Sequence, residues 1–342
     1  MLQVVDAGVL ATIQDAGRPA YTDVGVPIGG ACDPWSLAVA NALQGNDPAA
    51  PVLEITLAGP VFEVRGTCAV ALAGADLGAR VEGEYRLLAP GRVHLLRDGT
   101  RFRFAARRHG ARAYLALAGG VTAPIVLGSA STCLPGEFGG LDGRPLRAGD
   151  RLLPRRPGDL ERAGLAWPDE LAVAGLAWPE ESAAAQDPTQ PWVVHVVEGP
   201  HAAQGAPGAL EALCSREWEI GAASDRTGLR LAGPPLPTAP GQGELVSTGT
   251  VWGAVQLPPD GAPIVLLADA PPVGGYPVPA VAARADWPVL GQLAPGDRVR
   301  FVRVTIEQAQ RRCREQRQAL ERGTGLLARA EPWDDLVGRA GG

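Results

Sequence analysis

The stretch LPPDGAPIVLLADAPPVGGYPVP, from Leu257 to Pro279, sets the expectation for the fold. Its prolines and Gly261 predict a turn, residues 264–267 predict a short buried strand, and a second turn follows at Gly274. Because Pro fixes φ and Gly tolerates positive φ, such loops hold polar side chains with little conformational freedom. The alternative is a Pro-rich hairpin with no role beyond the fold. The polar side chains that these loops and the preceding strand would present are Gln256, Asp260, Asp269 and Tyr276.

A second stretch of the same character, IQDAGRPAYTDVGVPIGGACDPWSLAVANALQGND, occupies residues 13–47. Asp33 followed by Pro34 is typical of an N-cap and the first helical position, so a helix is expected over about residues 34–43. Amides at this helix start, with Asp15 and Arg18 in the preceding loop, could bind a small anion or polarise a carbonyl. The alternative is an ordinary capped helix and a surface ion pair between Asp15 and Arg18.

Composition favours a strand-rich protein of about two domains. The chain has 342 residues, and its 45 Gly and 32 Pro fall between short apolar runs, as in strands joined by tight turns. A net charge of −6 and basic residues without clustering argue against nucleic-acid binding. No apolar run approaches the ~20 residues of a membrane span, and the start lacks the features of a signal peptide. We expect a cytoplasmic protein that binds neither nucleic acid nor membrane.

The sequence contains no lysine, so all 31 basic residues are arginines. This absence excludes chemistry that needs a lysine on this chain: Schiff-base formation, a P-loop and covalent biotinylation. The five cysteines are far apart and without a CxxC pair, which favours free thiols over disulfides or a thiolate zinc site. The four histidines include no HxH or HExxH, and His195, within WVVHVV, fits a hydrogen-bonded core histidine better than a ligand. We predict no protein-bound metal.

Alternating sequences organise the chain into two β-domains. PVFEVRG and TRFRFA place phenylalanines on one face and charged residues on the other, as expected of half-buried strands in an N-terminal domain over residues 1–154. LRAGDRL at residues 146–152 has an echo in LAPGDRV at residues 293–299, which indicates a second, similar domain over residues 192–304. Between them, residues 155–191 contain the duplicated AGLAWP and predict a linker with one or two short helices. A charged helix from Thr305 to about Glu321 and a loosely held tail follow.

Several motifs together carry a family resemblance. They are QDAGR within the N-terminal loop, LEITLAGP, AYLALAGG, LGSAST, SDRTGLRL, GAVQLPPDGAPIVLLAD and VGGYP, in this order over residues 1–304. In these the chain resembles the biotin-dependent carboxyltransferase family, whose members include allophanate hydrolase subunit 2, KipA and the C-type subunit of 5-oxoprolinase. The resemblance implies a mainly β protein of two cyclophilin-like β-barrel domains with a few short helices and a C-terminal helix. One departure is clear: Pro272, Val273 and Val278 stand where the family loop usually reads TTGGYPK.

The resemblance leaves three functions open. The first is a subunit of an ATP-dependent 5-oxoprolinase complex, which hydrolyses 5-oxo-L-proline to L-glutamate. The second is a carboxyltransferase subunit that moves a carboxyl group from carboxybiotin to urea or a similar amide. The third is a regulatory subunit that binds a KipI-like inhibitor of a histidine kinase. The oxoprolinase function implies a companion subunit of related β-fold, similar to KipI or the B-type subunit of 5-oxoprolinase, and a third, LamB/YcsF-like subunit.

Nucleotide binding and activity depend on these partners in the expected complex. No cofactor is expected to be bound covalently. Without a lysine or a P-loop, we expect ATP on another subunit or at an interface. The chain alone is expected to be inactive, because its acids, arginines and tyrosine do not supply the polarisation that opening a lactam requires.

The two rigid polar loops predict one composite site for a small amide substrate. Arg18 or Arg226 would hold a substrate carboxylate, and Asp15 or Asp260 would accept a proton when an amide nitrogen or water is activated. The alternative is two unrelated structural turns. The predicted catalytic residues are Asp15, Asp33 and Asp260. The predicted substrate-binding residues are Arg18, Asp225, Arg226, Gln256 and Tyr276.

Overall fold

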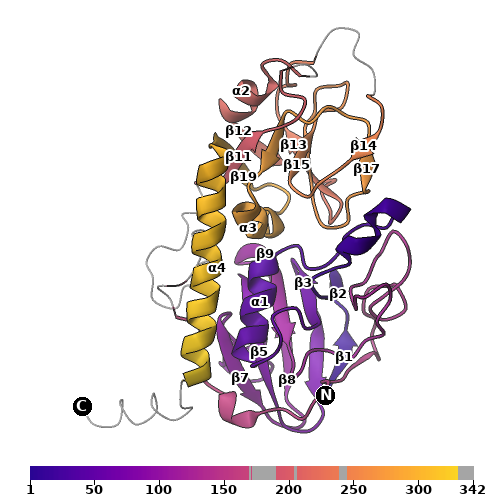
Figure 1. Cartoon of the computed structure of the whole chain (residues 1–342). Coiled ribbons are helices and arrows are strands. Elements are labelled where there is room, and N and C mark those ends of the chain that lie inside the picture. The colour runs from indigo at the N-terminus through magenta and orange to yellow at the C-terminus, as the bar shows by residue number, and fades with distance from the viewer. Residues whose placement is uncertain (169–170, 172–189, 204–205, 239–244, 330–342) are drawn as a thin grey trace, which may run out of the picture. The chain divides into compact units, whose positions relative to one another are not determined.

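The chain folds into two compact units in the computed structural model, which describes residues 1–168, 171, 190–203, 206–238 and 245–329 (Figure 1). The N-terminal unit comprises the described residues within Met1–Ala16, Pro34–Ala185 and Arg317–Gly342. The barrel unit comprises the described residues within Gly17–Asp33 and Gln186–Gln316. The loop at residues 17–33 therefore groups with strands that follow it much later in the sequence. Within the described part of the chain, no helix has the length and apolar character needed to cross a membrane.

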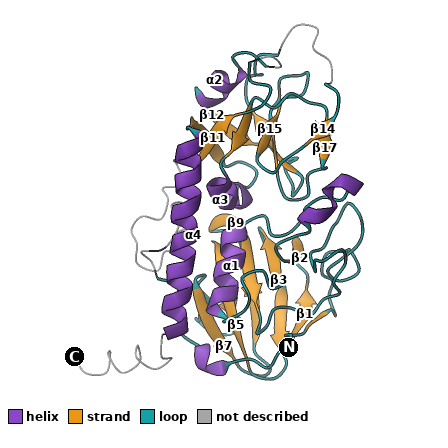
Figure 2. Cartoon of the chain, in the orientation of Figure 1, coloured by secondary structure: helices purple, strands orange, loops and turns teal. Residues whose placement is uncertain are grey.

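Two five-stranded antiparallel sheets make up most of the N-terminal unit (Figure 2). The first has the order β10 (Arg151–Leu152), β1 (Leu2–Asp6), β4 (Val61–Val64), β8 (Arg101–Phe104), β6 (Ala79–Val81). The second has the order β2 (Leu10–Gln14), β3 (Val52–Thr56), β9 (His109–Ala116), β5 (Cys68–Asp76), β7 (Arg92–Leu96). The predicted alternation is confirmed, because Phe62 and Phe102 are register partners, fully buried, with ring centroids 5.2 Å apart.

Helix α1 covers part of the second sheet of this unit. It spans Pro34–Leu43, the residues predicted from the sequence, and packs on β5 and β9 (Figure 1). Gly45 ends it with a φ of +63°, a conformation that favours glycine. Nearly every α1 side chain is buried, so the helix is held by packing on all sides.

Seven strands close into a barrel in the second unit, so the mainly β fold with a barrel is confirmed. The order around the barrel is β11 (Trp192–Glu198), β18 (Ala280–Ala282), β15 (Ala254–Gln256), β16 (Ile264–Leu266), β13 (Gly228–Ala232), β12 (Glu217–Ile220), β19 (Arg298–Arg303). Closure satisfies the strand edges, and β11 pairs with β19 in parallel to complete it. A small sheet of β14 (Thr248–Gly249) and β17 (Val273–Gly274) and the helices α2 (Ala209–Cys214) and α3 (Trp287–Gln292) lie in the connections.

The repeated LRAGDRL and LAPGDRV segments form the same local structure. Asp150 accepts a hydrogen bond from the Arg147 amide at 2.7 Å, and Asp297 accepts one from the Ala294 amide at 2.8 Å. The glycine before each aspartate has a positive φ, +92° at Gly149 and +86° at Gly296. The similarity seen in the sequence therefore reflects one turn used twice, each time leading into a strand.

The predicted end of the C-terminal helix was wrong. Helix α4 runs over Ile306–Arg329, beyond the expected end at about Glu321. Gly323 lies within this helix against Trp167, where an added Cβ would come within 2.3 Å of the ring, so the close approach favours glycine there. Of the predicted linker, the structure describes a short 3-10 helix, η2 (Leu160–Arg162), while residues 169–170 and 172–189 and the tail at 330–342 lie outside the described residues.

Candidate functional site

The loop at residues 17–33 is fastened to one end of the barrel. It contains the 3-10 helix η1 (Pro19–Val24), and the Arg18 amide closes the loop by donating to the Ile28 carbonyl at 2.7 Å. The Gly29 amide donates to the Ala268 carbonyl, just beyond β16, at 2.9 Å. The N-terminal loop and the Pro- and Gly-rich stretch that begins at Leu257 are thus in direct contact, while the composite site predicted from these two stretches stays a prediction.

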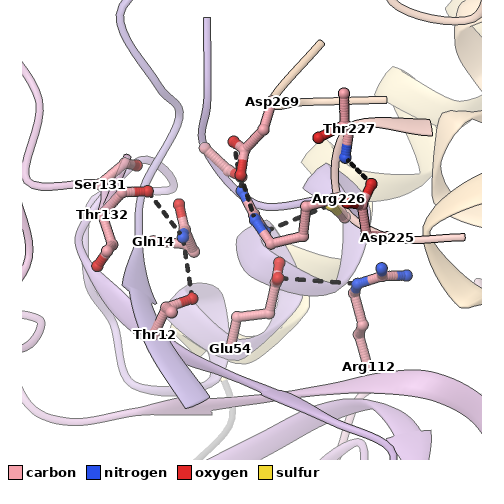
Figure 3. Close-up of polar contacts among 12 residues, drawn as sticks. Thr12, Gln14, Glu54, Arg112, Ser131, Thr132, Asp225, Arg226, Thr227 and Asp269 are labelled. Carbon is pink, nitrogen blue, oxygen red and sulfur yellow. Dashed lines mark hydrogen bonds and ion pairs between the residues drawn. The ribbon is translucent and has the colours of Figure 1, made fainter. Parts of the chain in front are cut away.

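Arg226 is the centre of this attachment. Its guanidinium donates to Asp269 in a bidentate manner, from Nε to Oδ2 at 2.8 Å and from Nη2 to Oδ1 at 3.0 Å (Figure 3). Nη2 also donates to the Gly30 carbonyl at 2.7 Å, and Nη1 to the Cys32 thiol at 3.3 Å. We call these four residues, Arg226, Asp269, Gly30 and Cys32, the Arg226 cluster. All of them are buried, so the charges of the pair are held away from water.

The bidentate edge of Arg226 faces Asp269, so the geometry favours a positioning role for this arginine. The predicted alternative, that Arg226 holds a substrate carboxylate, stays a prediction. Arg18 lies beside the same cluster: a Cβ added to Gly29 would be 3.3 Å from Arg18 Nη1 and 3.9 Å from Asp269 Oδ1. Gly29 has a φ of +65°, so the close approach and the backbone conformation both favour glycine there.

Two further predicted residues support this end of the barrel unit. Asp225 is exposed, and its Oδ1 accepts from the amides of Thr227 at 2.7 Å and Gly228 at 3.2 Å, which fixes the turn that carries Arg226 (Figure 3). Asp33 is fully buried and accepts from Gln292 Nε2 on α3 at 2.7 Å. Both contacts are structural in form, while the roles predicted for these residues in binding and catalysis stay predictions.

The other predicted residues of the barrel unit lie elsewhere. Asp260 is exposed in the turn between β15 and β16, where its Oδ1 accepts from the Ala262 amide at 3.0 Å. Because Gly228 pairs with Leu266 and Arg230 with Ile264, Asp260 lies at the end of β16 opposite to Asp225 and Asp269. Gln256 is buried against Gly274, where an added Cβ would approach its Nε2 to 2.4 Å, and Tyr276 is half-buried nearby in sequence.

Asp15 belongs to the N-terminal unit and holds a loop there. Its Oδ1 accepts hydrogen bonds from the hydroxyls of Ser129 and Ser131, and its Oδ2 accepts from the Ala130 amide at 2.6 Å. The Asp15 amide in turn donates to Ser131 Oγ at 2.9 Å. The QDAGR and LGSAST motifs are therefore joined to each other, and the geometry favours a structural role for this carboxylate, although its predicted role as proton acceptor stays untested.

A third arrangement couples titratable groups in the barrel unit. Asp286 Oδ2 accepts from the His195 amide at 2.6 Å and lies 2.7 Å from His195 Nδ1, while Oδ1 accepts from Arg312 of α4 at 2.9 Å. Burial alone would raise the pKa of the Asp286 carboxyl, but the hydrogen bonds from His195 and the charge of Arg312 hold this pKa below its ordinary value. The prediction that His195 is a hydrogen-bonded histidine is confirmed. Across the described residues, no group of three or more His, Cys, Asp or Glu side chains is placed to hold a metal ion.

Sequence reasoning named Asp269 among the polar side chains of the rigid loops but did not select it as a site residue, and it missed Gln292, Ser129 and Ser131. Asp269 had a signal, because it follows the buried run IVLLA directly and a carboxylate at that place needs a partner. Gln292, Ser129 and Ser131 had none beyond their residue type, since each contacts an aspartate far away in the sequence.

Comparisons with known proteins agree with this architecture. The family model for the carboxyltransferase domain, subdomain A and B, matches residues 24–303. The C-type subunit of Escherichia coli 5-oxoprolinase is 34% identical over 326 residues, which cover 94% of this chain and 97% of that protein. Urea amidolyase of Lachancea kluyveri is 30% identical over 93% of this chain, which is 18% of that protein. The crystal structure of Kluyveromyces lactis urea amidolyase matches with a TM-score of 0.82 at 28% identity, over 94% of this chain and 20% of that one.

The chain belongs to the biotin-dependent carboxyltransferase family. It spans about a fifth of the length of the two urea amidolyases and nearly the whole of the 5-oxoprolinase subunit.

Proposed function

We propose that the chain is a subunit of an ATP-dependent 5-oxoprolinase complex that hydrolyses 5-oxo-L-proline to L-glutamate. The observation that carries the proposal is the mutual coverage with the C-type subunit of 5-oxoprolinase, 94% of one chain and 97% of the other. In the urea amidolyases the matching region is a minor part of a much longer protein.

The chain's own groups suit a part of the reaction. Hydrolysis of the lactam breaks the ring C–N bond, adds the oxygen of water to the carbonyl carbon and leaves the nitrogen as an amine. An unactivated amide requires strong polarisation of its oxygen, and the buried arginines of the described residues are already engaged. We therefore assign substrate positioning to this chain, through the loop at residues 17–33 and the Arg226 cluster.

The nucleotide is assigned to another subunit or to a shared interface. The chain has no lysine, so no P-loop lysine can contact a β- or γ-phosphate here. Activity then depends on companion subunits, for which the KipI-like and LamB/YcsF-like proteins implied by the resemblance are the candidates. The chain alone is expected to be inactive.

Reconstitution tests this proposal. The chain is purified alone and together with the subunits encoded beside it, each sample receives 5-oxo-L-proline and ATP, and glutamate and ADP are measured. Glutamate formation only by the full set supports the proposal. Glutamate from the single chain contradicts the dependence on partners, and none from the full set overturns the function.

A carboxyltransferase is the second candidate, favoured by the TM-score of 0.82 with a urea amidolyase. The same reconstitution distinguishes it when urea, bicarbonate and a biotinylated carrier protein replace 5-oxo-L-proline. Carboxylation of urea that requires this chain would favour this function over lactam hydrolysis.

A further inference from the structure

The proposed function makes no use of the pair formed by His195 and Asp286 on the outside of the barrel. On β11, His195 lies between Val194 and Val196, which are fully buried in the barrel core, so strand alternation turns His195 outward. Asp286 reaches it from the end of the 3-10 helix η4 (Arg284–Asp286). The His195 side chain keeps 20% of its surface exposed, whereas that of Asp286 keeps 2%. The histidine is therefore accessible and its carboxylate partner is not.

Asp286 decides which nitrogen of the His195 ring carries the proton. Its carboxyl is ionised at neutral pH, because the pKa of this group lies below its ordinary value. An ionised carboxylate accepts and does not donate, so the hydrogen lies on His195 Nδ1, which is 2.7 Å from Oδ2. In the neutral ring, Nε2 then holds the lone pair. Nε2 has no hydrogen-bond partner within the described part of the chain and is not enclosed by it, so this lone pair faces solvent.

The same carboxylate also fixes the ring and prepares it for a positive charge. Oδ2 of Asp286 accepts from the His195 backbone amide at 2.6 Å as well as from the ring, which restricts rotation of the side chain. When Nε2 of an imidazole forms a new bond, the ring becomes cationic, and a carboxylate at Nδ1 stabilises that charge. A fixed imidazole with a carboxylate at one nitrogen and a free lone pair at the other is the arrangement of an activated nucleophile.

Arg312 supplies a positive charge on the far side of Asp286. Its Nη2 donates to Asp286 Oδ1 at 2.9 Å, so the guanidinium is one carboxylate away from the His195 ring. Arg312 Nε is buried and has no acceptor among the residues that the structure describes. This arginine therefore has a donor to spare. A nearby guanidinium favours the addition of an anionic group to the ring over a neutral one, which points to a phosphoryl group.

We propose that His195 is a phosphoryl-acceptor site, whose Nε2 takes a phosphoryl group from a small donor with a good leaving group, such as an acyl phosphate or a phosphoramidate. The Nε2 lone pair forms the bond to phosphorus. The bond from phosphorus to the leaving group breaks, and its electron pair departs with a carboxylate or with ammonia. No proton has to move, because Nδ1 keeps its hydrogen and the new ring charge is stabilised by Asp286. The inference does not depend on lactam hydrolysis.

Other histidines of the chain are internal controls for this reaction. The full chain is incubated with potassium phosphoramidate at neutral pH, and phosphohistidine at each position is followed by mass spectrometry without acid treatment. His94 Nε2 lies 2.8 Å from the Ala89 carbonyl, and His201 Nδ1 accepts from the Val278 amide at 3.1 Å, so neither ring has a carboxylate in this role. We expect His195 to react at least about tenfold faster than either.

Two variants separate the parts played by the neighbours of His195. Asp286→Asn keeps the shape of the side chain and loses its charge, so phosphorylation of His195 should slow at least about tenfold. Arg312→Gln is measured with phosphoramidate and with diethyl pyrocarbonate, an uncharged reagent for histidine. It should slow phosphorylation at least about threefold and leave carbethoxylation within about twofold of the unmodified rate. Arg314→Gln, on the same helix and exposed, is the matched control and should change neither rate.

Several results would overturn the inference. One is phosphorylation of His195 no faster than that of His94 and His201, and another is an unchanged rate in Asp286→Asn. Carbethoxylation of His195 without any phosphorylation, or an equal loss of both reactions in Arg312→Gln, would show that the site does not select a phosphoryl group. Circular dichroism checks that each variant is folded. If Asp286→Asn fails to fold, the comparison among the histidines of the unmodified chain still decides.

Discussion

Strand β16 has an aspartate beyond each end, and the two side chains are in opposite environments. Asp260 precedes the strand, is exposed, and accepts a single backbone hydrogen bond within its own turn. Asp269 follows the strand, is buried, and is held in a bidentate pair by Arg226, which also holds Gly30 and Cys32. One carboxylate closes a local turn, and the other connects three segments distant in sequence.

The difference shows that a rigid loop is not enough to mark a functional carboxylate. Both aspartates follow Pro- or Leu-rich sequence and both are fixed in position. What separates them is burial together with a charged partner, because removing a buried partner is costly whereas an exposed turn tolerates change. The following predictions measure this difference, beginning with the largest effect.

Arg226→Ala should have the largest effect on stability. It leaves the Asp269 carboxylate buried without its partner, which typically costs about 3–5 kcal/mol. Urea unfolding of the full chain measures the loss, and hydrogen exchange at the Gly29 amide should accelerate because the loop at residues 17–33 is released. Asp260→Ala is the comparison and should change the free energy of unfolding by no more than about 0.5 kcal/mol. Equal effects of the two variants would remove the contrast between the ends of β16.

Asp286→Ala should have the next largest effect and lower the free energy of unfolding by about 2–3 kcal/mol at neutral pH, because His195 and Arg312 both lose their acceptor. The loss should depend on pH. Since the pKa of Asp286 is lowered in the folded chain, its contribution is complete above the ordinary carboxyl pKa of about 4 and disappears as pH falls through the lower folded value. Urea unfolding of both proteins between neutral and strongly acidic pH tests this. A difference that stays constant down to the lowest pH would show that the carboxylate charge is not involved.

Asp225→Ala should lower the free energy of unfolding by a smaller amount, about 1 kcal/mol, because the hydrogen bonds that Asp225 accepts from the amides of Thr227 and Gly228 are lost at an exposed turn. The effect should nevertheless exceed that of Asp260→Ala, which loses a single bond of the same kind. Thermal unfolding of the two variants side by side is the measurement. The reverse order would mean that the turn carrying Arg226 needs no support from Asp225.

Much of the fold was predictable from local patterns. Alternation identified the strands around Phe62 and Phe102, and the Asp-Pro pair at residues 33–34 marked the start of α1. These features depend on neighbours in the sequence. The end of α4 was missed, and Gly323 inside this helix lies against Trp167, a contact between residues far apart in the chain that no local pattern shows.

The sequence singled out segments of the candidate site but not the contacts between them. Sequence reasoning selected the two stretches that meet at Gly29 and Ala268, and it selected Arg226. It selected Asp260 as a catalytic residue and did not select Asp269, because only strand pairing shows which end of β16 lies near the loop at residues 17–33. The hydrogen bond between Tyr114 and Glu54 was not predicted, because it joins two strands whose pairing register no local pattern reveals.

Glutamate formation by the reconstituted complex, carrying either Asp269→Asn or Asp260→Ala, tests the account most directly. We predict that Asp269→Asn lowers turnover at least about tenfold with assembly intact, because Arg226 no longer holds the loop at residues 17–33 in place. Asp260→Ala should stay within about twofold of the unmodified complex. Loss of turnover in Asp260→Ala, with Asp269→Asn fully active, would contradict the account and return the catalytic role to the exposed turn.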